Sequence, residues 1–174
     1  LNKLRTVLSA QGLDGILITN LTSIRYICGF TGSAASCLIT QDDSYFISDG
    51  RYDVQSREQV QNMERYIDFG THISIVTKNN LIQNGSNLAF EGDHTSVSQY
   101  RVMTDSFPKV VWNSTSMLIE NLQAVKDESE LDAIRTAVEI TDTVYAEILP
   151  MLKPGTTEKE VANQMVLRYR QERD

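Results

Sequence analysis

The sequence predicts a layered α/β domain followed by two helices. Over residues 1–123, short apolar runs typical of buried strands alternate with amphipathic or polar segments, which indicates a sheet covered by helices. Residues 124–174 hold 7 basic and 11 acidic side chains, against 9 and 12 in the much longer first part, and their apolar pattern is helical. We therefore expect one domain at 1–123 and a separate helical segment at 124–174.

The first part opens with a helix and continues into strands. Leu4, Leu8 and Gln11, with Val7 beside them, fit one face of a short helix that ends at Gly12. The apolar runs that we expect to form strands are 15–19, 36–40, 44–48, 73–76, 88–90 and 109–112, the second and third of which form a hairpin around residues 41–43.

Two helices are expected between these strands. Residues 53–61 have the polar composition of a surface helix. Ser96 and Gln99 have the spacing of a capping box, which opens a helix that runs through Phe107.

The second part predicts two helices, each opened by a capping box and separated by the break at 153–155. Asp127 with Glu130, and Thr157 with Glu160, have the required spacing. Steps of three and four predict one buried face on each helix, made of Leu131, Ile134, Val138, Thr141, Tyr145 and Ile148 on the first and of Val161, Met165 and Tyr169 on the second. No helix terminator precedes Asp174, so we expect a truncated chain whose natural sequence continues.

Composition excludes several classes of protein. The chain has 174 residues, 41% of them hydrophobic, which is enough for one sizeable core and excludes a wholly disordered chain. The net charge of −7 argues against nucleic acid or an anionic membrane as a partner. No apolar run approaches the about 18 residues of a membrane span, and the N-terminal residues lack a signal-peptide pattern. We expect a cytoplasmic protein with Cys28 and Cys37 as unbridged thiols.

Self-contained hydrolytic chemistry is not predicted. The sequence has two histidines, His72 and His94, as candidate bases and lacks the G-x-S-x-G nucleophile motif. Glu91, Asp93 and His94 could attract a divalent ion, but acidic residues at this position also favour the start of the following helix. We therefore predict no catalytic residue and no metal site in this chain.

Two further segments admit a functional and a structural interpretation. The glycines of 29–33 could approach a phosphate, but the segment lacks a phosphate-loop lysine, and a close turn of the backbone is the better interpretation. Arg51 follows a strand, where its guanidinium could meet a substrate carboxylate or pair locally with Asp49 or Asp53. Tyr52 could likewise serve a functional contact, or it could pack on the edge of the sheet.

Four segments together resemble one known family. They read N-L-T-S-I-R-Y-I-C-G-F-T-G-S at 20–33, D-G-R-Y-D-V-Q-S at 49–56, V-K-D-E-S-E-L-D-A-I-R-T-A at 125–137 and K-P-G-T-T-E-K-E-V at 153–161. In this order and spacing they resemble the creatinase/prolidase N-terminal domain and the opening of the catalytic domain in Xaa-Pro aminopeptidases and proline dipeptidases. Ser23 stands where many members carry Asn or Asp, and Cys28 replaces the usual Thr or Ser.

The resemblance implies a fold and an activity. The N-terminal domain would be a ribonuclease-H-like α/β fold with a mixed sheet flanked by helices, and 124–174 would be the first helices of a truncated pita-bread domain. The full-length enzyme would be a homodimer that cleaves Xaa-Pro bonds in proline-containing peptides with two divalent ions, manganese, cobalt or zinc, bound by residues absent from this chain. The fragment alone would be inactive.

The resemblance also implies a role for this domain, which is to support dimerisation and to shape the substrate cleft. Ser23, Tyr26, Arg51 and Tyr52 are the residues we expect to contact the cleft or the partner subunit. Two alternatives share the fold: a non-catalytic protein-binding module and a creatinase-like amidinohydrolase, which uses no metal.

Overall fold

The computed structural model describes residues 1–172. The chain divides into two compact units, Leu1–Ala124 and Val125–Asp174. The end of the helical pattern at residues 173–174 lies outside the described residues. Within the described part of the chain, no helix is long and apolar enough to cross a membrane.

The first unit is built on a mixed sheet whose six strands, counted within residues 1–172, have the order β4-β3-β2-β1-β5-β6. Their bounds are β1 Gly15–Ile18, β2 Ser36–Thr40, β3 Ser44–Ser48, β4 Glu64–Ile67, β5 Asn87–Glu91 and β6 Val111–Thr115. The predicted hairpin is confirmed, because β2 and β3 pair antiparallel with Cys37 opposite Phe46. Strand β1 pairs antiparallel with β2 and parallel with β5, so the strand direction changes in the middle of the sheet.

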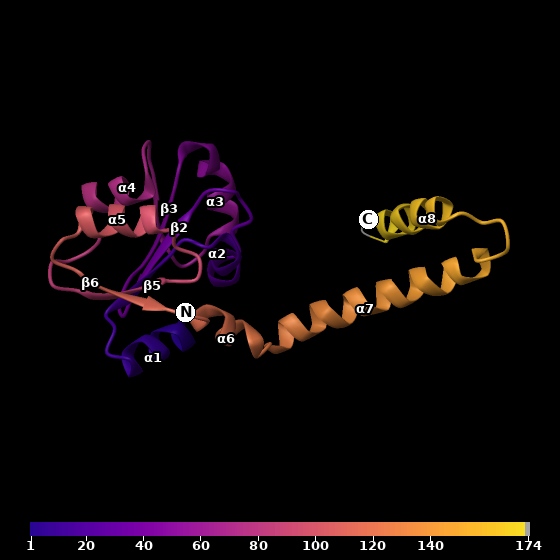
Figure 1. Cartoon of the computed structure of the whole chain (residues 1–174), viewed down its shortest axis with the longest axis horizontal. Coiled ribbons are helices and arrows are strands. Elements are labelled where there is room, and N and C mark those ends of the chain that lie inside the picture. The colour runs from indigo at the N-terminus through magenta and orange to yellow at the C-terminus, as the bar shows by residue number, and fades with distance from the viewer. Residues whose placement is uncertain (173–174) are drawn as a thin grey trace. The chain divides into compact units, whose positions relative to one another are not determined.

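Helices cover both faces of this sheet (Figure 1). Their bounds are α1 Asn2–Ala10, α2 Leu21–Cys28, α3 Asp53–Gln59, α4 His72–Lys78, α5 Val97–Ser106 and α6 Leu118–Ala124. One core joins α1, α2 and α6 to the face that carries Ile16, Cys37 and Ile39. The other joins α4 and α5 to the face that carries Leu17 and Leu38. Because side chains alternate along a strand, β1 and β2 contribute to both cores.

Local signals explain where most helices begin. The Asn20 side chain accepts a hydrogen bond from the Thr22 amide at the start of α2, and Gly29 ends that helix with a φ of +77°. The capping box of Ser96 and Gln99 is present at the start of α5, as predicted. The helices expected near the N-terminus and at 53–61 are confirmed as α1 and α3.

Some of the helices and strands in the structure differ from those predicted from the sequence. The predicted strand 73–76 is wrong, because these residues lie in α4, which Thr71 caps through the Ser74 amide. The β-branched residues of this segment favour a strand locally, but Ile75 and Val76 are buried against the sheet from a helix, so tertiary packing decides. Strand β4 and helices α2 and α6 were not predicted, and β6 begins at Val111, two residues after the start of the expected strand 109–112.

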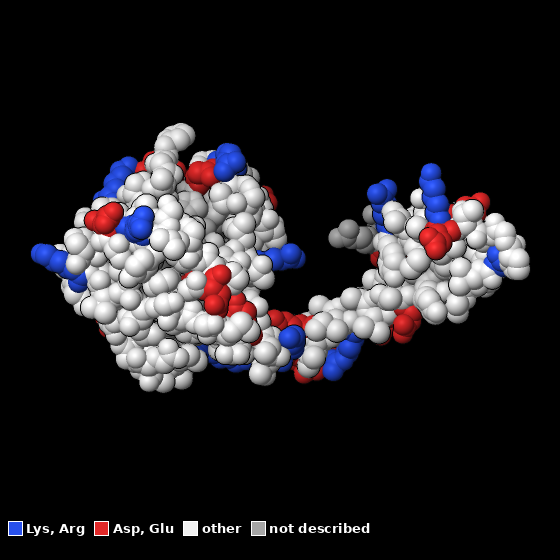
Figure 2. All heavy atoms as spheres, in the orientation of Figure 1, with Lys and Arg blue, Asp and Glu red and all other residues white. Residues whose placement is uncertain are grey.

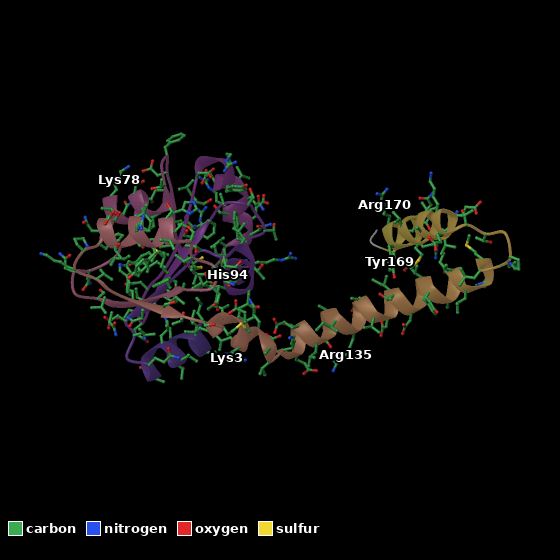
Figure 3. All side chains as sticks on the ribbon, in the orientation of Figure 1. Lys3, Lys78, His94, Arg135, Tyr169 and Arg170 are labelled. Atoms are coloured by element: carbon green, nitrogen blue, oxygen red, sulfur yellow. The ribbon has the colours of Figure 1, made fainter. Side chains whose placement is uncertain are left out.

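The second unit contains two helices within its described residues, α7 Glu128–Ile148 and α8 Glu158–Gln171, with a 3₁₀ turn η2 Leu149–Met151 between them. Both predicted capping boxes are present. The helices pack against each other, and the Arg168 guanidinium on α8 pairs with the Glu147 carboxylate on α7. Tyr169 lies on the same helix as Arg168 (Figure 3).

The predicted buried face of α7 is wrong over most of its length in this unit. Ile148 and its neighbour Val144 are buried, but Ile134, Val138 and Tyr145 are 46%, 51% and 57% exposed. Helix α8 covers only part of α7, because α8 has 14 residues and α7 has 21. The remaining residues of the predicted face of α7 form an exposed apolar surface of the second unit.

Candidate functional site

Arg51 is held by a tight turn immediately after β3. Asp49 caps the 3₁₀ turn η1 Gly50–Tyr52, and its Oδ1 accepts a hydrogen bond of 3.0 Å from the Arg51 amide. The Arg51 guanidinium donates from Nε and Nη2 to the two oxygens of the same carboxylate, each at 2.9 Å. This bidentate pair lowers the pKa of Asp49 to about 2. The local pairing considered for Arg51 is therefore present.

Tyr52 connects the same turn to the glycine-rich segment 29–33. The Tyr52 ring packs edge-on against the Phe30 ring with a centroid distance of 5.3 Å. The Arg51 guanidinium lies 5.3 Å from the centroid of the Tyr52 ring. The Tyr52 hydroxyl lies 2.6 Å from the Ser33 Oγ and accepts a hydrogen bond from the Ser33 amide. These bonds lower the pKa of Tyr52. The hydroxyl thus fixes the turn and the segment relative to each other.

The glycines of the segment 29–33 are required by the backbone conformation and by close packing. Gly29 adopts the left-handed conformation that ends α2. A Cβ on Gly32 would lie 2.3 Å from the Phe30 Cζ and 2.7 Å from the Tyr52 Cε1. The close approach at Gly32 is therefore to two aromatic rings, whereas the sequence suggested a close approach of backbone to backbone.

The other two expected contact residues lie on α2. Ser23 is 1% exposed and faces the interior of this unit. Tyr26 is half-buried, packs against the core and donates from its hydroxyl to the Leu122 carbonyl at 3.3 Å. The structure brings Arg51 and Tyr52 together at an accessible turn, whereas Ser23 and Tyr26 serve the packing of α2 within the unit.

A Ser–His pair that sequence reasoning missed lies close to this turn. Ser36 starts β2 and His72 starts α4, and the Ser36 Oγ lies 2.8 Å from the His72 Nδ1. Burial lowers the pKa of His72, while the negative charge of Asp49 opposes that shift. The two residues are 36 positions apart, and no local motif joins them.

The Ser–His pair lines a cavity of about 470 Å³. Its walls come from β1, the segment before β2, and the helices α4 and α5, and they are Leu17, Thr19, Leu21, Ser33, Ala34, Ala35, Ser36, Thr71, His72, Ile73, Val76, Ser98, Gln99, Val102 and Met103. The lining is mostly apolar with a few hydroxyl, amide and imidazole groups, which suits an uncharged or apolar group that needs one or two hydrogen bonds.

The acidic segment 91–94 is used for internal contacts. Glu91 is buried, and its Oε2 accepts hydrogen bonds of 2.9 Å from the Thr19 and Asn20 amides, at the start of α2 rather than of α5. His94, labelled in Figure 3, places its Nε2 3.1 Å from the Glu120 Oε1. Among residues 1–172, no three His, Cys, Asp or Glu side chains are grouped so that they could hold a metal ion.

Charged side chains are scattered over the visible face of the first unit, and basic and acidic groups alternate there without an extended basic patch (Figure 2). This distribution agrees with the net charge of −7.

Comparison with known proteins gives consistent relatives. The family model described as the Creatinase/Prolidase N-terminal domain matches residues 1–125. The uncharacterized peptidase YqhT of Bacillus subtilis is 32% identical over 166 residues, which are 95% of this chain and 47% of the relative. The structure of an Xaa-Pro dipeptidase from Bacillus anthracis is similar over 98% of this chain and 48% of its own, with 33% identity and a TM-score of 0.86.

An X-Pro aminopeptidase from Thermotoga maritima is similar over 92% of this chain and 47% of its own, with 30% identity and a TM-score of 0.81. The chain thus spans about half the length of the relatives it matches.

Proposed function

Because this chain belongs to the creatinase/prolidase N-terminal domain family, we propose that it is the substrate-cleft-shaping half of a peptidase that cleaves Xaa-Pro bonds. The observation that carries the proposal is the likeness to an Xaa-Pro dipeptidase, which extends over 98% of this chain with a TM-score of 0.86. In this proposal the first unit is ribonuclease-H-like, and α7 and α8 open a pita-bread catalytic domain. The enzyme is a cytoplasmic homodimer.

Catalysis belongs to the remainder of that enzyme. Two divalent ions, manganese, cobalt or zinc, would activate a water molecule for attack on the peptide bond. The described residues of this chain supply no group of ligands for such ions. Their role is therefore to bind and orient the proline-containing peptide and to hold the two subunits together.

Arg51 is the best placed residue for a substrate contact. Its side chain is 70% exposed, and the bond to Asp49 uses the Nε and Nη2 edge of the guanidinium. Within residues 1–172 the Nη1 group has no protein acceptor, so it can donate to a peptide carboxylate or carbonyl. Asp49 orients the guanidinium in advance, which reduces the entropy lost when a ligand binds. Tyr52 fixes the adjoining loop through Ser33.

The proposal is tested in the full-length protein that contains this chain. Arg51→Ala and Tyr52→Phe are compared with Arg57→Ala, a matched control whose arginine is 64% exposed and also pairs with a carboxylate, that of Asp53. We expect Arg51→Ala to lower kcat/KM for Xaa-Pro peptides by about tenfold or more, the scale of one charge-assisted contact. Arg57→Ala should leave it unchanged. Equal effects of the two substitutions would contradict a substrate role for Arg51.

A further inference from the structure

The cavity that Ser36 and His72 line lies where two connections of the chain diverge. Strands β1 and β5 are adjacent and parallel. The chain leaves β1 for α2 and β2 on one side, and it leaves β5 for α5 and β6 on the other side. In α/β sheets, ligands bind in the crevice outside the carboxyl ends of such a pair of strands. The cavity lies in this crevice, because it is lined by Thr19 and Leu21, directly after β1, and by Gln99, in the first turn of α5.

The apolar lining of the cavity continues from the core to the solvent. Leu17, Val76 and Met103 are buried and belong to the core between the sheet and the helices α4 and α5. Leu21 and Val102 also line the cavity but are exposed. The buried residues form the floor of the cavity, and the exposed ones lie at its mouth. Apolar surface at the mouth of an open cavity is stabilised when an apolar group covers it.

The Ser–His pair gives the cavity a polar group that matches a peptide unit. Ser36 is buried, and its Oγ is bonded to the His72 Nδ1 at 2.8 Å. Because burial lowers the pKa of His72, the imidazole is neutral at pH 7, with one donor and one acceptor nitrogen. In the part of the chain that the structure describes, the His72 Nε2 makes no hydrogen bond. Depending on the tautomer, it can bond to the C=O or to the N–H of a peptide group.

The rest of the lining selects against a charged occupant. Among the described residues that line the cavity, none is Asp, Glu, Lys or Arg. An ionised ligand group would lose its hydration there without gaining a partner of opposite charge. Ser33 lines the cavity and also contacts the Tyr52 hydroxyl, and the Tyr52 ring lies beside the Arg51 guanidinium. A peptide that places one residue in the cavity can therefore continue toward the turn that carries Arg51.

We propose that this cavity binds an uncharged, apolar side chain of a peptide, and that Ser36 and His72 bind the peptide group next to it. The volume of about 470 Å³ is in the range of sites for small ligands. The inference rests on the proposed function and adds a preference for peptides that carry a large aliphatic or aromatic residue. The thioether of Met103 in the wall adapts to side chains of different shape.

The test measures binding of three neutral or charged peptide-like probes to this chain. The ¹⁵N-labelled protein is titrated with N-acetylleucinamide, N-acetylglycinamide and N-acetyllysinamide, and the amide shifts are followed by NMR. We expect the leucine probe to bind about tenfold or more tightly than the other two, because it alone buries an apolar side chain. The shifts should centre on Ser36, His72 and Val102. Equal affinities, no binding of the leucine probe, or shifts confined to the second unit would overturn the proposal.

Two substitutions on α5 locate the binding site. Val102→Asp places a carboxylate at the mouth of the cavity and should weaken binding of the leucine probe by about tenfold or more. Val97→Asp is the matched control, because Val97 is an exposed valine of the same helix that does not line the cavity. It should leave the affinity unchanged, and equal effects of the two substitutions contradict the assignment. Binding does not require cleavage, so failure here leaves the proposed peptidase function standing, and an inactive full-length protein leaves the binding result standing.

Discussion

Replacing Gly32 by alanine should destabilise the first unit through two aromatic rings. The new Cβ would lie 2.3 Å from the Phe30 Cζ and 2.7 Å from the Tyr52 Cε1, both well inside normal contact. Phe30 has little room to move, because it is 1% exposed and packs against Phe46 at a centroid distance of 4.8 Å. Relief must therefore come from the backbone of the segment or from displacement of Tyr52.

The magnitude follows from two opposing terms. Forcing an extra methyl group into a packed site costs about 1–3 kcal/mol. Alanine also restricts the unfolded chain, which returns about 0.4–1 kcal/mol. Because the new methyl group would overlap two rings, we take the upper half of the first range and expect a net loss of about 1–2.5 kcal/mol in the free energy of unfolding.

Urea unfolding followed by tryptophan fluorescence measures this loss. Trp112 is the only tryptophan in the sequence and lies in β6, so the signal reports on the first unit. Gly50→Ala is the matched control, because a Cβ there meets nothing within 4 Å. It should change the free energy of unfolding by less than about 0.5 kcal/mol. If Gly32→Ala is as stable as the control, the packing argument for this segment is wrong.

Three further predictions concern charged and titratable groups of the first unit. Arg51→Ala should leave the urea midpoint of this chain unchanged, because the ion pair with Asp49 is solvent-exposed; a large drop in the midpoint would make Arg51 a structural residue. The folded pKa of His72 lies below its unfolded value of about 6.5, so the unfolded state binds more protons and stability falls as the pH drops through that window. In His72→Gln this acid-side slope should be smaller, and parallel stability curves from pH 5 to 8 for the two proteins would contradict the burial of a neutral imidazole. Glu91→Ala should cost about 1–3 kcal/mol in urea unfolding, because two amides at the start of α2 lose their acceptor, and a loss well below that range would show that these amides find another partner.

Features that depend on residues close together in the sequence could be predicted from it. The capping boxes at Ser96, Asp127 and Thr157 need only a side chain and an amide three residues apart, and all three are present. The hairpin of β2 and β3 needs only a turn between two apolar runs. These signals, together with the family resemblance, placed the mixed α/β sheet and its flanking helices.

Features decided by distant residues could not be predicted. The β-branched segment 73–76 became a helix because two of its side chains pack on the sheet. The Ser36–His72 pair depends on which elements the fold brings together. At the candidate site, the pairing of Arg51 with Asp49 was foreseen as one of two alternatives, while the ring contacts of Gly32 were not.

The central claim is that this chain serves a peptidase specific for Xaa-Pro bonds, and one measurement tests it most directly. The full-length protein that contains this chain is supplied with manganese and offered Ala-Pro, Ala-Ala and creatine, and the released products are quantified. We expect release of proline from Ala-Pro, much less cleavage of Ala-Ala and no hydrolysis of creatine, with no proline released by this chain alone. Hydrolysis of creatine, or no release of proline from Ala-Pro, would contradict this claim.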